Sequence, residues 1–247
     1  MILYDEAWCP GLERTVKLHI RLPEGYEKEE ARYPVMYMFD GHNLFEDARA
    51  TYGRSWRLDE FLSGYDKPFI IVGLECDHRE NNRLHEYCPY EVEKTPLGPL
   101  HGKGQILMDW IVHDLKPLVD AHFRTWPQRE ATGIAGSSMG GLMAWYALIR
   151  YNDTFSKAAA LSPSLAVCAG QAHRELRQAS VDPDTRLYIS AGGREGRGAG
   201  NRRLLREFSA PLVKKGAMAR MNFVPQGAHN EASWEKESPV WFDYLWK

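Results

Sequence analysis

The sequence contains little cysteine, and its cysteines lie far apart. The 247 residues include four of them, Cys9, Cys76, Cys88 and Cys168. No two form a CxxC pair, which argues against a structural zinc site and against the disulfide framework of a small secreted domain. We therefore expect free thiols in a reducing compartment, with no metal and no cofactor.

Long apolar runs and an excess of one charge are also missing. No stretch reaches the roughly 18 consecutive apolar residues of a membrane-spanning helix, and the first six residues have no basic segment typical of a signal peptide. The net charge of −2 provides no basic field for nucleic acid or anionic lipid. These absences predict a cytoplasmic protein that acts on a small molecule, without a nucleic-acid or membrane partner. They leave the oligomeric state open.

The length and the order of apolar segments indicate the fold class. A chain of 247 residues with 44% hydrophobic residues suits one α/β domain spanning residues 1–247. Segments rich in β-branched and aromatic residues alternate with segments of helical period, which predicts a mostly parallel sheet with helices on both faces. We expect strands at 15–22, 34–39, 69–74, 131–136, 157–161, 186–190 and 219–224. We expect helices at 105–123, 142–150, 201–214 and 233–246.

One long segment, 75–103, shows no clear periodicity. Loops of this length are usually functional or mobile. The segment carries Arg83, Glu86 and Tyr87, which are candidates for substrate binding because they offer hydrogen bonds and an aromatic wall. A solvated surface excursion without a role is the alternative, and the sequence leaves both open.

The segment Gly136-Ser137-Ser138-Met139-Gly140 matches the pattern G-x-S-x-G. A predicted strand precedes it and a predicted helix follows it, which is the context of a nucleophile elbow. Small neighbours such as Gly136 and Gly140 permit the strained turn that such a serine needs. The amide of Met139, at the positive end of the helix dipole, then points at a developing oxyanion. The alternative is a turn of small residues that only packs helix on strand, but the context favours Ser138 as nucleophile.

A serine hydroxyl at neutral pH needs a positioned imidazole to take its proton. Two histidines follow Ser138 in the chain, His173 and His229. His173 lies in a segment of helical pattern, whereas His229 follows the last predicted strand. Active sites of parallel sheets form at the carboxyl ends of the strands, so we expect His229 to be the general base. A loop histidine without a role is the alternative.

The third member of a triad is expected to be a carboxylate between the serine and the histidine. The candidates are Asp153, Glu175, Asp182, Asp184, Glu195 and Glu207. Asp182 and Asp184 precede a predicted strand and therefore lie at the wrong end of the sheet, and three others belong to helical segments or helix ends. Glu195 follows the carboxyl end of a strand in a glycine-containing loop. We therefore expect Glu195 to orient His229, with a solvated loop charge as the alternative.

A second oxyanion donor in this arrangement comes from the loop after the strand at 34–39. That loop reads Asp40-Gly41-His42-Asn43. Its glycine lets the backbone approach a substrate closely, and the amides of His42 and Asn43 are the candidate donors. A simple strand-ending turn is the alternative.

These motifs together resemble the putative-esterase family of α/β-hydrolases, which includes esterase D-like, siderophore esterase and feruloyl esterase members. The resemblance rests on the segments 38–45, 83–87, 135–141, 190–196 and 229–234. It implies an α/β-hydrolase fold, a triad of Ser138, Glu195 and His229, and an oxyanion hole formed by the amides of His42 and Met139. Many members carry Gln in place of His42, so the resemblance implies only a backbone role there.

The leading hypothesis is a serine carboxylic ester hydrolase that acts on a small soluble ester through an acyl-enzyme intermediate. The segment between 161 and 186 has room for about one helix, so no cap or lid domain is expected there. Two alternatives stay open. One is an acyltransferase that uses the same residues, and the other is a catalytically silent binding protein on the same fold.

Overall fold

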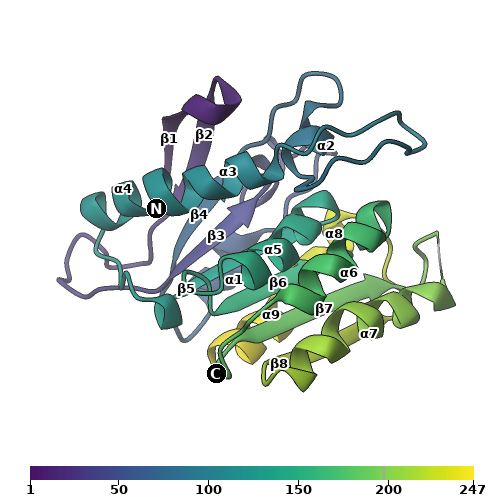
Figure 1. Ribbon diagram of the computed structural model, residues 1–247. Helices are drawn as coiled ribbons and strands as arrows, with labels where there is room; N and C mark the ends of the chain where they lie inside the picture. Colours follow the sequence, from purple (N-terminus) through teal and green to yellow (C-terminus); the bar gives the residue numbers. More distant parts are fainter. Residues whose placement is uncertain (197) are drawn as a thin grey trace.

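The computed structural model describes residues 1–196 and 198–247, and its centre is an eight-stranded sheet (Figure 1). The strands are β1 (Ile2–Cys9), β2 (Arg14–Arg21), β3 (Val35–Phe39), β4 (Ile70–Leu74), β5 (Thr132–Ser137), β6 (Lys157–Leu161), β7 (Arg186–Gly192) and β8 (Met218–Val224). Their order in the sheet is β1-β2-β4-β3-β5-β6-β7-β8. Strand β2 pairs antiparallel with β1 and β4, and the pairs from β4 to β8 are parallel.

Helices cover both faces of the sheet. They are α1 (Leu58–Ser63), α2 (Asn82–Glu86), α3 (Gly104–Trp110), α4 (Lys116–His122), α5 (Met139–Arg150), α6 (Ala169–Gln178), α7 (Ala199–Lys214), α8 (Glu231–Glu235) and α9 (Ser238–Trp246). Helices α3 to α7 lie over one face, and α1, α8 and α9 pack on the other (Figure 1). Burial on both sides explains why the central strands read as continuous apolar runs in the sequence.

Side chains of the central strands alternate between the two faces. In β4, Ile70 and Val72 belong to the core under α3 to α7, whereas Ile71 belongs to the core under α1 and α9. Strand β3 repeats the pattern, with Tyr37 on the first side and Met38 on the second. This period of two fixes the register of the sheet, because a slip by one residue would move every side chain to the opposite core.

The expected fold class is confirmed. The seven expected strands and the mostly parallel sheet are present, and β6 and β7 are joined by a short 3-10 helix, Leu165–Cys168, and α6, with no cap domain within residues 162–185. The sequence prediction missed β1, an edge strand in which four of the eight residues are exposed and only Cys9 is buried, so that it gives little apolar alternation.

Proline alters the α-helical geometry of two expected helices. The helix expected at 105–123 contains a π-helical turn, Ile111–Leu115, immediately before α4. Pro117 lies in the first turn of α4, and a wider turn relieves the clash that its ring would make with an α-helical carbonyl four residues earlier. The helix expected at 233–246 is two helices, α8 and α9, with Pro239 in the first turn of the second.

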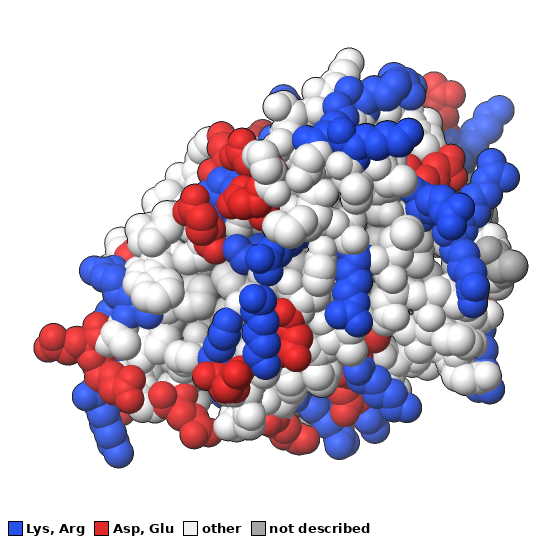
Figure 2. Space-filling model, turned by 90° about the horizontal axis from the view of Figure 1, so that it is seen from below, with Lys and Arg blue, Asp and Glu red and all other residues white. Residues whose placement is uncertain are grey.

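In the described part of the chain, no helix has the length and apolar character needed to cross a membrane. On the face drawn in Figure 2, basic and acidic side chains are interspersed with large uncharged areas.

Candidate active site

Ser138 occupies the sharp turn between β5 and α5. Its backbone has φ 58° and ψ −121°, a strained conformation for a residue with a side chain. The turn requires glycine on both sides: a Cβ on Gly136 would lie 2.6 Å from the backbone of Gly140, and a Cβ on Gly140 would lie 2.9 Å from Cβ of Phe39. The glycines expected from the sequence therefore permit the close contact that exposes Ser138 above the sheet edge.

Hydrogen bonds tie this turn to the segment that follows β6. The amide of Ser138 donates to the carbonyl of Leu161 (3.0 Å), and the amide of Ser164 donates to the carbonyl of Ser138 (2.9 Å). The side chains also meet, with Oγ of Ser138 3.4 Å from Oγ of Ser164. The nucleophile candidate is thus held by backbone bonds, while its hydroxyl makes only a long contact.

His229 and Glu195 meet at the carboxyl ends of β7 and β8. Nδ1 of His229 lies 3.3 Å from Oε2 of Glu195, while Oε1 of Glu195 accepts from the hydroxyl of Ser162 (2.6 Å) and the amide of Gly192 (2.7 Å). Burial alone would raise the pKa of the Glu195 carboxyl, but the hydrogen bonds from His229, Ser162 and Gly192 outweigh it and hold the pKa below its usual value. Glu195 is therefore an anion at neutral pH.

Trp234 supports this pair from α8. Its indole N–H donates to the hydroxyl of Ser162 (3.0 Å), and its ring meets the ring of His229 edge to face at 5.1 Å. The loops after β7 and β8 also touch, since a Cβ on Gly192 would lie 2.3 Å from the carbonyl oxygen of Gly227. Packing and hydrogen bonds together limit the orientations open to His229.

Two cavities flank these residues. Ser138 and His229 share a cavity of about 320 Å³, and its other walls come from residues 40–52, 76–83 and 231–234. On the other side of His229 lies a second cavity of about 480 Å³, whose lining includes Glu195, Ser164 and residues 94–96. The aperiodic segment 75–103 therefore contributes a wall to each cavity.

The loop after β3 forms one wall of the smaller cavity. Asp40 has φ 58°, and a 3-10 helix, Gly41–Asn43, follows it. Arg83 donates to both carboxylate oxygens of Asp40, each at 2.7 Å. Burial would raise the pKa of Asp40, but the Arg83 guanidinium outweighs it and holds the pKa below its usual value. This bidentate pair fixes the loop that carries His42.

We expect Arg83→Met to lower the free energy of unfolding by about 3 kcal/mol at neutral pH, because it leaves the buried Asp40 carboxylate without a partner. In the intact pair, the pKa of Asp40 is lower in the folded protein than in the unfolded chain. The pair therefore stabilises the folded protein fully at pH values above the pKa of Asp40 in the unfolded chain. This stabilisation is lost as the pH falls through the pKa of Asp40 in the folded protein. The difference between variant and parent should therefore shrink in acid.

Urea unfolding at pH 7 and at acidic pH measures this difference. Arg49→Met is the matched control, because Arg49 pairs with Glu46 and both side chains are about half exposed, and exposed pairs contribute about 0–1 kcal/mol. Equal losses in the two variants would contradict the assigned role of Arg83.

The structure does not bring Glu86 and Tyr87 to either cavity. Glu86 is buried and accepts from the guanidinium of Arg14 (2.6 and 2.8 Å) and from the amide of Asp77 (3.0 Å). The hydroxyl of Tyr87 accepts from the amide of Asp40 (3.1 Å). Both side chains contact residues of the wall of the smaller cavity without lining it. Of the three substrate-binding candidates, only Arg83 lines that cavity.

The histidine and carboxylates that sequence reasoning set aside lie elsewhere. His173 on α6 lies 2.8 Å from Oε1 of Glu207 on α7 and stacks on Phe208. Asp184 precedes β7 and pairs with Arg129, as its place at the amino end of the strand implies. None of these side chains lines the cavity that contains Ser138.

Sequence reasoning missed Ser162, Ser164, Trp234 and Tyr52. Ser162 and Ser164 follow the carboxyl end of β6, so the rule that selected Glu195 also points to them. Tyr52 lines the smaller cavity and is 80% exposed, but no periodicity marks it in the sequence. Trp234 lies in the segment 233–246, for which the sequence predicted only a helix.

Comparisons with known proteins identify relatives of the chain. The profile of the family described as “Putative esterase” matches residues 10–243. The uncharacterized protein YbbA of Bacillus subtilis is 25% identical over 182 residues, which are 71% of this chain and 67% of that protein. The siderophore triacetylfusarinine C esterase of Aspergillus fumigatus is 29% identical over 176 residues, 66% of this chain and 56% of the fungal protein. The esterase Rv1288 of Mycobacterium tuberculosis is 27% identical over 162 residues, 63% of this chain and 29% of the mycobacterial protein.

Solved structures resemble the chain over its whole length. An IroE-like serine hydrolase of Shewanella oneidensis superimposes with a TM-score of 0.77 at 22% identity, covering 99% of this chain and 79% of that one. The enterobactin esterase of Shigella flexneri gives a TM-score of 0.75 at 18% identity, covering 100% of this chain and 58% of that one. At these identities the likeness establishes the α/β-hydrolase fold.

Proposed function

This chain belongs to the putative esterase family of α/β-hydrolases, and we propose that it hydrolyses a small soluble carboxylic ester with Ser138, His229 and Glu195 as its triad. One observation carries the proposal. The strained turn at Ser138 opens into the same cavity as His229, and His229 is bonded on its far side to an anionic Glu195. This combination is what an acyl-transfer site needs: a nucleophile, a base and a group that orients the base.

The reaction proceeds through an acyl-enzyme. Oγ of Ser138 attacks the carbonyl carbon while Nε2 of His229 takes its proton, and the amides of Met139 and His42 stabilise the oxyanion. The alcohol leaves with the proton held by His229. Water then attacks the acyl-enzyme with His229 again as base, the acid is released, and Ser138 regains its proton.

Glu195 acts through His229. Its carboxylate accepts a hydrogen bond from the N–H at Nδ1, which leaves Nε2 without a proton and able to act as the base. The hydrogen bonds from Ser162 and the Gly192 amide hold the carboxylate in place. Arg83 is a positioning residue, since it holds Asp40 at the start of the loop that carries the His42 amide.

The walls of the site favour a polar or aromatic ester. The smaller cavity is lined largely by polar and charged side chains, with Tyr52 exposed at its edge. Tyr52 offers an aromatic surface to a substrate without burying a long apolar chain. The names of similar proteins fit this class, since they include a siderophore esterase and a ferulic acid esterase.

A fluorophosphonate probe tests the proposed function directly, because it reacts only with an activated serine. We expect stoichiometric labelling that maps to Ser138 and disappears in Ser138→Ala. Failure of the folded parent protein to react, together with no turnover of any activated ester, would indicate a silent binding protein and overturn the proposal.

Acyl chain length provides a test of substrate class. A groove that buries an acyl tail gains about 0.8 kcal/mol per methylene, and the polar walls around Ser138 offer no such gain. We therefore expect kcat/KM on p-nitrophenyl acetate or butyrate to exceed that on dispersed palmitate by roughly tenfold or more. A preference for palmitate, confirmed with a second long-chain ester, would contradict the small-ester assignment.

A further inference from the structure

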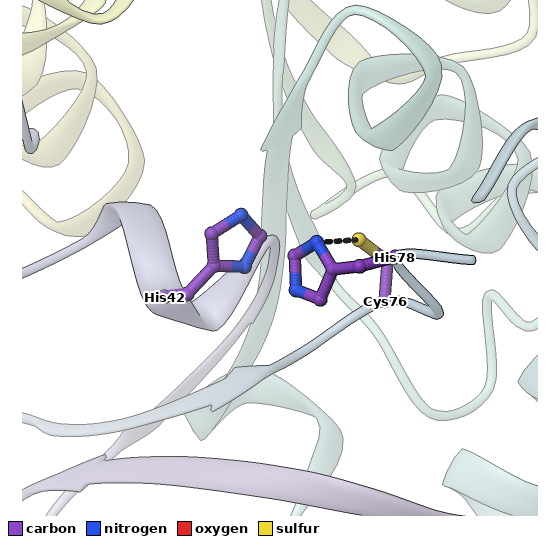
Figure 3. Close-up of side chains that lie close together, drawn as sticks. All are labelled: His42, Cys76 and His78. Carbon is purple, nitrogen blue, oxygen red and sulfur yellow. Dashed lines mark hydrogen bonds between the residues drawn. The ribbon is translucent and has the colours of Figure 1, made fainter. Parts of the chain in front are cut away.

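Three side chains with metal-binding groups meet in the wall of the smaller cavity, and the proposed mechanism uses none of them. They are His42, from the 3-10 helix after β3, and Cys76 and His78, from the segment after β4. One ligand atom from each lies within 4.8 Å of the others. Figure 3 shows the His78 ring between the His42 ring and the Cys76 sulfur.

Each histidine is bonded through one ring nitrogen and leaves the other toward the cluster. Nε2 of His42 lies 2.9 Å from the hydroxyl of Thr51, while its Nδ1 is buried and has no hydrogen-bond partner among the described residues. His42 is only 7% exposed, so this nitrogen is also shielded from water. An unpaired buried nitrogen costs free energy, which a ligand bound to it would recover.

His78 repeats this arrangement from the other side. Its Nε2 lies 3.1 Å from Oε1 of Glu75, and its Nδ1 lies 3.9 Å from Sγ of Cys76. Glu75 also contacts His19 at 2.8 Å, which holds the carboxylate in place. A carboxylate on the outer nitrogen of a histidine is the usual support of a metal-binding imidazole, because it fixes the ring and its tautomer.

We propose that His42, Cys76 and His78 bind a zinc ion whose fourth position opens into the cavity of Ser138. Tetrahedral zinc with nitrogen and sulfur ligands places neighbouring ligand atoms about 3.3–3.6 Å apart. The separation of Cys76 Sγ and His78 Nδ1 is already close to this value. The three ligand atoms lie within 4.8 Å of one another, so zinc binding requires them to draw together by about 1 Å.

The ligand types and the nearby charges select a cation of this kind. Two imidazoles and a thiol suit zinc rather than magnesium or calcium, which prefer oxygen. The carboxylates of Asp40 and Glu75 lie beside the cluster and favour a cation there. The sequence gives no sign of this site, because His42 lies on a different loop from Cys76 and His78, which are two residues apart in the chain.

A zinc ion at this position would suppress ester hydrolysis, a consequence that rests on the proposed function. His42 supplies the proposed oxyanion amide, so fixing its ring restricts the loop. The ion would also occupy the cavity shared by Ser138 and His229. Inhibition should be reversible on chelation, because the zinc forms no covalent bond with Ser138.

Titration with zinc chloride, followed by calorimetry, measures binding separately from catalysis. We expect one zinc per chain, and affinity lower by about 10- to 100-fold or more in both Cys76→Ser and His78→Ala. Cobalt chloride should give a thiolate-to-metal charge-transfer band that disappears in Cys76→Ser. His101→Ala is the matched control, because His101 is exposed and belongs to the same 75–103 segment, and it should bind zinc as the parent does.

The outcomes separate the two proposals. Absence of binding to the folded parent, or affinity unchanged in both cluster variants, overturns the zinc site. Binding with the expected losses, in a protein that hydrolyses no ester, supports the site and overturns the esterase assignment instead. Zinc inhibition of hydrolysis in the parent and His101→Ala, weakened in Cys76→Ser and His78→Ala, supports both.

Discussion

Replacing Ser138 with alanine should lower kcat for ester hydrolysis by about 10⁴- to 10⁶-fold while the fold remains intact. The expected loss is large because no other group can form the acyl-enzyme once the hydroxyl is gone. Alanine retains the Cβ, so the strained backbone at φ 58° bears nearly the same side-chain bulk as before. Circular dichroism and thermal unfolding establish folding, and turnover of p-nitrophenyl acetate measures the loss.

Ser164→Ala is the matched control for this variant. It removes a hydroxyl 3.4 Å from that of Ser138 by the same chemical change, and we expect its kcat to stay within about tenfold of the parent. Near-normal hydrolysis by folded Ser138→Ala, or a greater loss in Ser164→Ala, would contradict the assignment of the nucleophile.

Glu195→Gln should lower kcat by about 10³- to 10⁴-fold, although the side chains have nearly the same shape. The Ser162 hydroxyl and the Gly192 amide both donate to Oε1, so the glutamine will place its oxygen there. Its NH₂ group will then face Nδ1 of His229 as a donor. This favours the tautomer with the proton on Nε2, which cannot accept the proton of Ser138.

Asp184→Asn provides the control for Glu195→Gln. It makes the same carboxylate-to-amide change at the opposite end of β7, where Asp184 contacts Arg129. We expect kcat close to that of the parent. If Asp184→Asn proved the more damaging change in steady-state kinetics, the assignment of Glu195 and the strand-polarity argument behind it would both fail.

Local sequence was sufficient where one segment specifies its own structure. The turn at Ser138 needs only glycines within two residues and a strand and helix on either side, all of which are contiguous in the chain. The position of Glu195 after β7 also follows from local order, because every parallel strand delivers its next residues to the same edge of the sheet. The order of strand and loop therefore placed these residues correctly relative to the sheet.

The aperiodic segment 75–103 shows where local sequence was insufficient. Arg83, Glu86 and Tyr87 are close together in the chain, yet only Arg83 lines the cavity. Apolar residues in this segment do not recur every two or every 3.6 residues, so the sequence does not indicate which side chains face inward. Glu86 turns inward because Arg14, far away in the sequence, supplies its partner.

The sequence by itself determined the α/β architecture, the elbow at Ser138 and the strand ends that carry Glu195 and His229, because periodicity and chain order act over short distances. Only the tertiary structure decided which partners these side chains meet. In the tertiary structure, Arg83 pairs with Asp40 instead of facing solvent. The loops after β3 and β4 also place His42 beside Cys76 and His78. Such contacts depend on the pairing of β3 with β4 in the sheet. The periodicity of a single segment does not indicate which distant strand it pairs with.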